Sequence, residues 1–162
     1  MIENEPLYES AHFSVDWPDY DDDAVVLSGR GVPTGLVIGR FFYGPRDVAI
    51  DRDERWCVIV GSGLVVYKLR HPWMPYDPGP VHRPANRFHK ENWGLPEVRG
   101  TDQWWEYGRD RPGLLELDSV AHVGGERFEA GWNPRTEDGP TRWAIMAESR
   151  IVRPLNWLPD IP

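Results

Sequence analysis

The chain of 162 residues is long enough for one domain, spanning residues 1–162, and too short for two independent hydrophobic cores. Its apolar fraction of 40%, which includes nine tryptophans, and its ordinary charged fraction of 27% exclude general disorder. The formal net charge of −8 argues against direct binding to nucleic acid, because phosphate contacts require clustered positive charge.

The acidic charge is concentrated in the N-terminal segment, residues 1–23. This segment has eight acidic residues and no lysine or arginine, whereas the rest of the chain has eighteen of each sign. Aromatic residues such as Phe13 are interleaved with the acids, which docking onto the domain or onto a partner would explain. The alternative is an acidic loop that only aids solubility. We predict a partner-binding surface here, made of Asp16, Trp17, Asp19, Tyr20, Asp21, Asp22 and Asp23.

Short β-like runs follow the acidic segment. Residues 24–28 and 35–43 are apolar runs that end at glycine and proline. Residues 46–70 contain three further runs, separated by a polar turn at 51–54 and a Gly-Ser-Gly loop at 61–63. Apolar, β-branched runs on either side of a short glycine-containing loop indicate a hairpin. We therefore predict that residues 46–70 form a three-stranded meander at the centre of the fold.

Residues 71–100 are predicted to form a long irregular loop, because their prolines cannot donate to a sheet ladder or continue a helix. A long loop in a compact domain is often functional. Exposed aromatic residues dominate binding hot spots, so we add Trp73, Tyr76 and Trp93 to the predicted partner-binding surface. Trp104 and Trp105 must face opposite sides of a strand, and we expect Trp105 to be the exposed member of the pair.

The C-terminal part of the chain is predicted to contain further strands. Residues 103–108 and 114–117 are expected to pair, and residues 120–123 and 127–132 to form a hairpin about Gly124-Gly125. The segment 142–149 fits either a strand or a short helix, and the tail from Pro154 is expected to be extended. The predicted fold is mainly β, with α+β possible. It has an antiparallel meander sheet, long Pro-rich loops and at most one or two short helices.

The sequence has few features that indicate catalysis or a bound cofactor. Gly61-Ser62-Gly63 lies between two predicted strands rather than before a helix, so Ser62 is interpreted as a turn residue. The chain has no dinucleotide, phosphate-loop or zinc-protease motif, and the run 19–23 lacks the glycine and glutamate of an EF-hand loop. We assign no catalytic residue, metal or cofactor. A site formed by His71, His82, His89 and Glu91 remains an alternative.

The location of the protein is inferred from its one cysteine and its N-terminus. Cys57 lies in an apolar run and is interpreted as a buried small hydrophobe, and a single cysteine excludes an internal disulfide. The N-terminus lacks the basic and apolar regions of a signal peptide. The longest apolar runs, about five or six residues, are far shorter than a membrane span. We expect a cytoplasmic protein that does not contact a membrane.

Two runs of the sequence are similar to a known class of proteins. They are residues 53–69, Asp-Glu-Arg-Trp-Cys-Val-Ile-Val-Gly-Ser-Gly-Leu-Val-Val-Tyr-Lys-Leu, and residues 103–109, Gln-Trp-Trp-Glu-Tyr-Gly-Arg. The region 51–110 that contains them resembles small bacterial immunity proteins of polymorphic toxin systems. The resemblance implies an acidic, cytosolic single domain that acts by occluding a cognate toxin. It implies no particular set of functional residues.

The leading hypothesis is therefore a binding protein rather than an enzyme. Its acidic segment, together with residues 71–93, would cover the basic active site of a cognate protein toxin, such as a nuclease or another nucleotide-using toxin. One alternative is a small enzyme with an aromatic and histidine-lined cleft that uses His82, His89 or Glu106. Another is a carbohydrate-binding or general interaction module that uses exposed tryptophans.

Overall fold

A computed structural model describes residues 5–78, 98–108, 115–132 and 141–155, and within them the fold is entirely β, with no helix. Three antiparallel sheets are present. The N-terminal sheet consists of β1 (Tyr8–Glu9), β2 (Phe13–Asp16), β3 (Ala24–Gly29) and β4 (Leu36–Arg40). The central sheet has the order β5 (Asp47–Ile50), β6 (Trp56–Gly61), β7 (Gly63–Lys68), β9 (Trp104–Tyr107), β8 (Arg99–Gly100). The C-terminal sheet consists of β10 (Ser119–Gly124), β11 (Arg127–Gly131), β12 (Arg142–Met146) and β13 (Ile151–Pro154). The prediction of a mainly β fold is confirmed.

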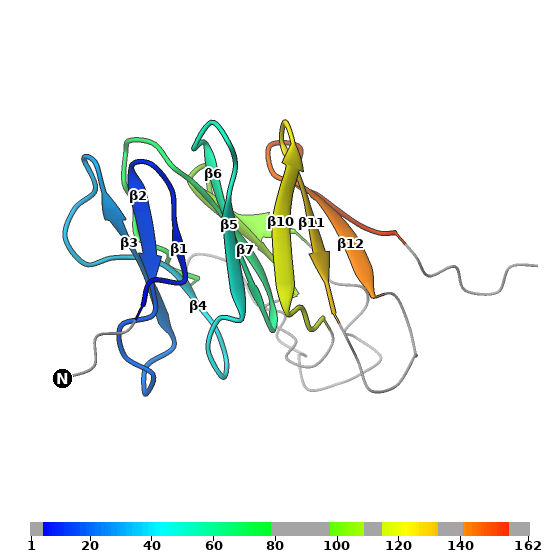
Figure 1. The fold of residues 1–162 in the computed structure, drawn as a ribbon, viewed down its shortest axis with the longest axis horizontal. Helices are drawn as coiled ribbons and strands as arrows, with labels where there is room; N and C mark the ends of the chain where they lie inside the picture. Colours follow the sequence, from blue (N-terminus) through cyan, green and yellow to red (C-terminus); the bar gives the residue numbers. More distant parts are fainter. Residues whose placement is uncertain (1–4, 79–97, 109–114, 133–140, 156–162) are drawn as a thin grey trace, which may run out of the picture.

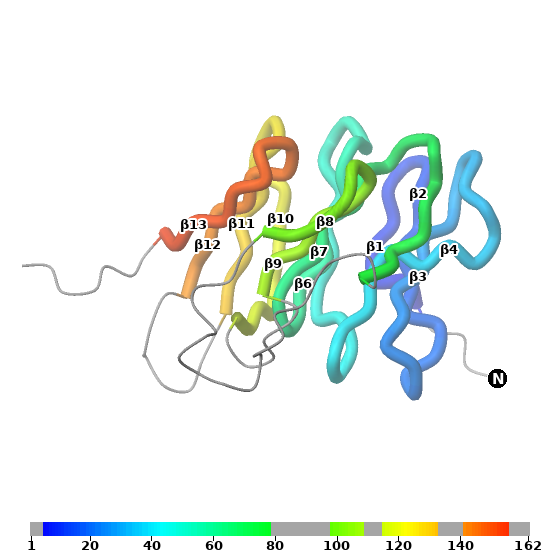
Figure 2. The backbone as a smooth tube through the Cα atoms, turned by 180° about the vertical axis from the view of Figure 1, so that it is seen from behind, coloured from blue at the N-terminus to red at the C-terminus, as the bar shows by residue number. Residues whose placement is uncertain are grey.

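The three sheets stack as layers in the order in which the chain forms them (Figure 1). In Figure 1 the first strand of each sheet, β1, β5 and β10, faces the viewer, and the view from behind in Figure 2 brings β8 and β13 to the front. One apolar cluster fills the space between the N-terminal and central sheets, and a second fills the space between the central and C-terminal sheets. The central sheet is therefore covered on both faces.

The two-sided burial explains the continuous apolar runs in the middle of the sequence. Every residue of β6 is buried, and so is every residue of β7 except Lys68. Successive side chains alternate between the layers, so Ile59 packs toward the N-terminal sheet while Val58 and Val60 pack toward the C-terminal sheet. The predicted meander at residues 46–70 is confirmed as β5, β6 and β7. Cys57 is fully buried, and burial followed by the charge of Asp51 raises the pKa of its thiol.

Trp104 and Trp105 also obey this alternation, but the exposure expected for Trp105 is wrong. Trp104 belongs to the cluster between the N-terminal and central sheets, and Trp105 belongs to the cluster between the central and C-terminal sheets. Trp105 is only 1% exposed, and its Nε1 donates to the carbonyl of Ala147 at 2.8 Å. The prediction failed because both faces of this strand are covered, so opposite orientation does not expose either side chain.

Other predicted elements are confirmed in part. The hairpin β10–β11 forms as expected, and residues 142–146 form strand β12 rather than a helix. The strand expected at 114–117 is wrong for its described part, where Glu116 makes only an isolated bridge to Ser62. The acidic segment contains the unpredicted strands β1 and β2, and the predicted loop 71–100 ends in the short strand β8. Residues 79–97 of that loop lie outside the described residues.

The β5–β6 turn is organised by one buried carboxylate. The Oδ1 atom of Asp51 accepts hydrogen bonds from the backbone N–H groups of Arg55 at 2.7 Å and Trp56 at 2.6 Å. Its side chain is completely buried, whereas that of Asp53 in the same turn is 74% exposed. Asp51 therefore supplies acceptors that water cannot replace.

The same turn is joined to the N-terminal sheet through Glu54. Its Oε2 accepts hydrogen bonds from the Ser10 hydroxyl at 2.5 Å and the His12 backbone N–H at 2.9 Å. Its Oε1 lies 2.6 Å from Nδ1 of His12. These hydrogen bonds, from His12 first and then Ser10, lower the pKa of Glu54 from 4.5 to about 2.

Replacing Asp51 should destabilise the protein strongly. We expect Asp51→Ala to lower the free energy of unfolding by about 1–3 kcal/mol, because it leaves backbone donors of the turn without their acceptor. Asp53→Ala in the same turn should change it by less than about 0.5 kcal/mol. Urea unfolding of the two variants measures the difference. Equal effects would contradict the capping role of Asp51.

Glu54 should make stability depend on acid pH. Its folded pKa lies below its ordinary value, so its ionised form stabilises the folded state. That stabilisation is complete above about pH 4.5 and is lost as the pH falls toward 2. Glu54→Gln should therefore be less stable than the native protein at pH 7, with the difference shrinking over this window. Urea unfolding between pH 7 and 2 tests this, and a gap that stays constant with pH would contradict it.

Candidate functional site

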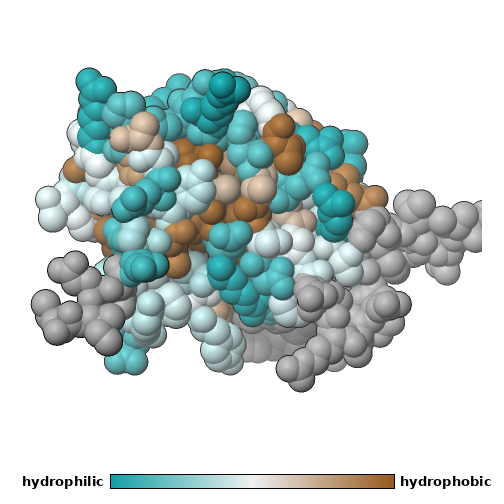
Figure 3. Space-filling model, in the orientation of Figure 1, coloured by the Kyte–Doolittle hydropathy of each residue, from teal (hydrophilic) through white to brown (hydrophobic). Residues whose placement is uncertain are grey.

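Two loops project from the same edge of the sheet stack. One is the β2–β3 loop at 17–23 and the other is the β4–β5 loop at 41–46. Both extend from the lower edge of the molecule in Figure 1, and in the space-filling view of Figure 3 they protrude below the apolar band that runs along the middle of this face. We call their combined surface the acidic–aromatic patch. Its exposed residues are Pro18, Asp19, Tyr20, Asp21, Asp22, Phe42, Tyr43 and Arg46. The one cation among them, Arg46, is paired with Glu116 at 2.5 Å.

The β2–β3 loop is held by its own hydrogen bonds. Asp19 accepts from the backbone N–H of Asp21 through Oδ1 at 2.9 Å and from that of Asp22 through its carbonyl, also at 2.9 Å. This is the local bonding that favours aspartate in turns. The indole Nε1 of Trp17 donates to the Asp22 carbonyl at 2.7 Å, and its ring lies 4.5 Å from that of Tyr20, centroid to centroid. The loop thus presents its carboxylates from a defined backbone.

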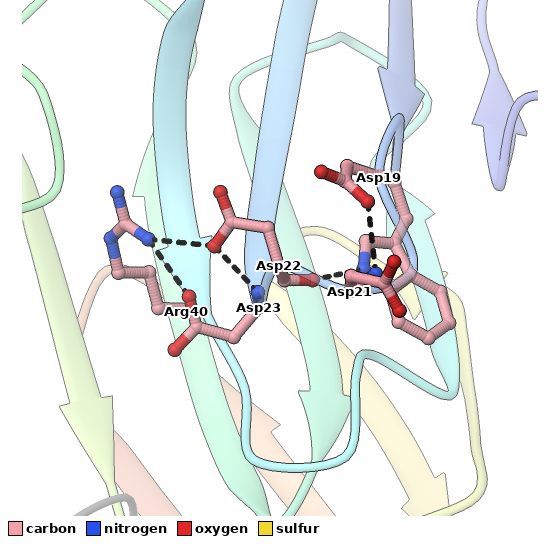
Figure 4. Close-up of polar contacts among 6 residues, drawn as sticks. Asp19, Asp21, Asp22, Asp23 and Arg40 are labelled. Carbon is pink, nitrogen blue, oxygen red and sulfur yellow. Dashed lines mark hydrogen bonds and ion pairs between the residues drawn. The ribbon is translucent and has the colours of Figure 1, made fainter.

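The acids of this loop fall into two groups. One Arg40 nitrogen contacts the carboxylates of Asp23 at 2.8 Å and Asp22 at 3.3 Å. Hydrogen bonding to Asp23, and then the charge of Arg40, lower the pKa of Asp22, while Asp23 raises the pKa of Arg40. Figure 4 shows Asp22 and Asp23 facing Arg40, with Asp19 and Asp21 on the other side of the turn. Asp19 and Asp21 have no cation partner among the described residues.

A close contact joins the two loops. Gly44 is buried against the Trp17 ring, and a Cβ atom at Gly44 would lie only 2.2 Å from Cη2 of Trp17. Tyr43, just before it, has a φ of 61°, a left-handed conformation that is uncommon for a residue with a side chain. This backbone turns the Tyr43 side chain outward, where it is 94% exposed. Phe42 is 53% exposed and Tyr20 is 62% exposed.

Phe42 and Tyr43 were missed in the sequence because they continue the apolar run 35–43 that was predicted as one strand. Strand β4 ends at Arg40, and Phe41 turns into the core. Gly44-Pro45 marks the end of the apolar run but not the earlier end of β4 at Arg40, so no local signal separates Phe42 and Tyr43 from the strand.

The structure brings together only part of the predicted surface. Asp16 ends β2, and Trp17 through Asp23 form the adjoining loop. Trp73 lies elsewhere, with its ring 6.0 Å from that of Phe13 and its Nε1 near Gly31. Tyr76 is only 5% exposed, because its ring packs on Trp104 at 4.6 Å and its backbone N–H bonds to Val37 of β4. Tyr76 and Trp105 are therefore corrected from surface to core residues, and Trp93 lies outside the described residues.

The residues named for the alternative functions are distributed differently. Glu106 is buried and its Oε2 accepts a 2.5 Å hydrogen bond from the Tyr76 hydroxyl, while His82, His89 and Glu91 lie outside the described residues. Within the part of the chain that the structure describes, no three histidine, cysteine or acidic side chains group as metal ligands. None of the tryptophans described there is among the exposed large hydrophobic residues.

Comparison of the chain with protein-family models, with curated proteins and with solved structures gives no match. The described residues include no apolar helix of the length needed to cross a membrane.

The contact between the two loops can be tested at Gly44. Its φ of +84° and its closeness to Trp17 both oppose a side chain, whereas Gly35 has a φ of +76° with no atom within 4 Å of an added Cβ. Gly35→Ala should cost about 1–2 kcal/mol of unfolding free energy from its backbone conformation alone. Gly44→Ala should cost about 1–3 kcal/mol more, because Trp17 must move. Equal losses on urea unfolding would show that Trp17 does not pack against Gly44.

Proposed function

We propose that this chain is a binding protein of the immunity type, which neutralises a cognate protein toxin by covering a basic surface with its acidic–aromatic patch. The observation that carries the proposal is the position of Asp19 and Asp21, without cation partners among the described residues, beside three exposed aromatic side chains. In this proposal the protein acts in the cytoplasm and performs no catalysis.

The physical argument combines charge and contact area. Carboxylates of one sign steer a basic partner toward the patch and disfavour acidic partners. Exposed tyrosine and phenylalanine supply large contact areas with few rotatable bonds, and their faces attract arginine and lysine. Tyr43 and Phe42 lie on one loop and Tyr20 on the other, so a partner would contact both loops at once.

Two features make the patch suited to a preformed interface. The β2–β3 loop is fixed by its Asp19 and Trp17 hydrogen bonds, and the β4–β5 loop is packed against it through Gly44. Little conformational entropy would then be lost on binding. The resemblance of residues 51–110 to immunity proteins favours a toxin as the partner over other basic proteins.

Charge reversal within the patch should weaken binding to the partner. The partner would be isolated from the native host by pull-down with the tagged chain. A protein that co-elutes with the chain in equal molar amount would be taken as the partner. We expect Asp21→Lys to weaken its binding at least tenfold at low salt, with less effect at high salt. The matched control is Asp53→Lys, which makes the same charge change at a residue that is 74% exposed in the β5–β6 turn.

Truncation of an aromatic residue is a second test of the acidic–aromatic patch. Tyr43→Ala should weaken binding at least tenfold, as for an interface anchor, while Met74→Ala, at a residue 54% exposed outside the patch, should leave it unchanged. Titration calorimetry measures all four variants. A partner that binds Asp21→Lys and Tyr43→Ala as tightly as the native protein would refute this assignment of the patch.

A further inference from the structure

A pocket of about 230 Å³ opens on the opposite edge of the molecule from the acidic–aromatic patch. It lies between the central and C-terminal sheets, beside the β5–β6 and β12–β13 turns, which are both at the upper edge of Figure 1. Its lining comes from the start of β6, the end of β7 and the two turns. The lining residues are Glu54, Arg55, Trp56, Lys68, Leu69, Arg70, Glu148 and Arg150.

Four of the lining residues are cations, although the chain as a whole is acidic. Lys68 is the cross-strand neighbour of Trp56, and its Nζ lies 5.8 Å from the indole ring. Neither Lys68 nor Arg70 has an ion-pair partner among the described residues. Two cations of the pocket lining are therefore not held in an ion pair within the described part of the chain.

Arg150 is brought to the pocket by an unusual backbone. Its φ is 57°, in the left-handed region, and its side-chain Nη2 donates to the carbonyl of Thr101. This hydrogen bond ties the β12–β13 turn to the segment before β9, so the guanidinium is held at the junction of two sheets. Residues with a side chain adopt this backbone at an energetic cost, and such residues are often found at functional sites.

The acidic lining residues do not cancel these charges equally. Both carboxylate oxygens of Glu54 are engaged by Ser10 and His12 outside the cation group. Arg55 is paired with Asp51 and Asp53, so it contributes less free charge than the other cations. Glu148 is exposed at the pocket, where its charge opposes an anion and offsets part of the positive charge of the lining.

We propose that this pocket binds a tetrahedral oxyanion, a phosphate group, through Lys68, Arg70 and Arg150, with Trp56 as its apolar wall. Arginine and lysine donate charge-assisted hydrogen bonds to phosphate oxygens, and arginine can donate two at once. The pocket is smaller than the sites of drug-sized ligands, so it fits inorganic phosphate or the phosphate end of a small phosphomonoester. The site is distinct from the patch of the proposed function and does not depend on it.

The test is a titration of the full chain with inorganic phosphate and, separately, with phenyl phosphate, at constant ionic strength and pH 7.5. Binding is followed by calorimetry and by amide NMR shifts. We expect saturable binding in the millimolar range or tighter, with amide shifts centred on residues 54–56, 68–70 and 148–150. Tighter binding of phenyl phosphate would identify a phosphomonoester as the favoured source, and equal binding would identify the free anion.

Four variants distinguish this site from general ionic association. Lys68→Gln and Arg70→Gln should each weaken phosphate binding about tenfold or more, since each removes a charged donor. Arg30→Gln, which removes an exposed arginine in the β3–β4 turn, should leave it unchanged. Glu148→Gln should strengthen it several-fold, because a like charge is removed from the pocket. Thermal unfolding without phosphate confirms that each variant is folded.

The proposal fails if native protein shows no saturable binding up to about 50 mM phosphate, well above the millimolar range expected here. It also fails if Arg30→Gln weakens binding as much as Lys68→Gln does. Because Asp21 and Tyr43 lie on the opposite edge, a negative result here leaves the partner-binding experiment unaffected, and the reverse also holds.

Discussion

Every residue of β6 and all but one of β7 are buried, so the central sheet must be covered on both of its faces. An antiparallel sheet more often keeps one face in water. Here, the N-terminal sheet covers one face and the C-terminal sheet the other. The hydrophobic free energy of this two-sided burial fixes the order of the three layers, and the turns that join the strands then gather at two edges of the stack.

Those two edges differ in chemistry. At one edge, Trp17 packs on Gly44 and holds the acidic loop beside the loop that carries Tyr43. At the other, the β5–β6 turn is fixed by Asp51 and the β12–β13 turn is tied to the central sheet through Arg150. Three described residues other than glycine have positive φ, namely Tyr43, Glu54 and Arg150, and all three lie at these edges. The layered core provides the rigidity, and the edges carry the groups available for binding.

The meander β5–β6–β7 of the central sheet was predictable, because strands that are buried on both faces have unbroken apolar runs. The pairing of β9 with β7 was not predicted. The strands β1 and β2 were not predictable, because the acids around them resemble a solvated segment. Alternation placed Trp104 and Trp105 on opposite faces but could not reveal that a second sheet covers each face. Tyr76 was misplaced for a related reason, since no local pattern shows that the Pro-rich segment lies along β4. The acidic loop was identified from its charge and its interleaved aromatic residues, whereas Phe42 and Tyr43 required knowledge of where β4 ends.

The proposed function requires the two loops at the acidic edge to form one binding surface. The most direct measurement is amide hydrogen exchange of the protein, free and in complex with its stoichiometric partner. We predict that protection on binding is concentrated in residues 17–23 and 41–46, with both loops protected together because they share the Trp17–Gly44 contact. Protection confined to the β12–β13 turn and the pocket beside it, with the acidic edge unchanged, would show that the two loops are not the binding surface.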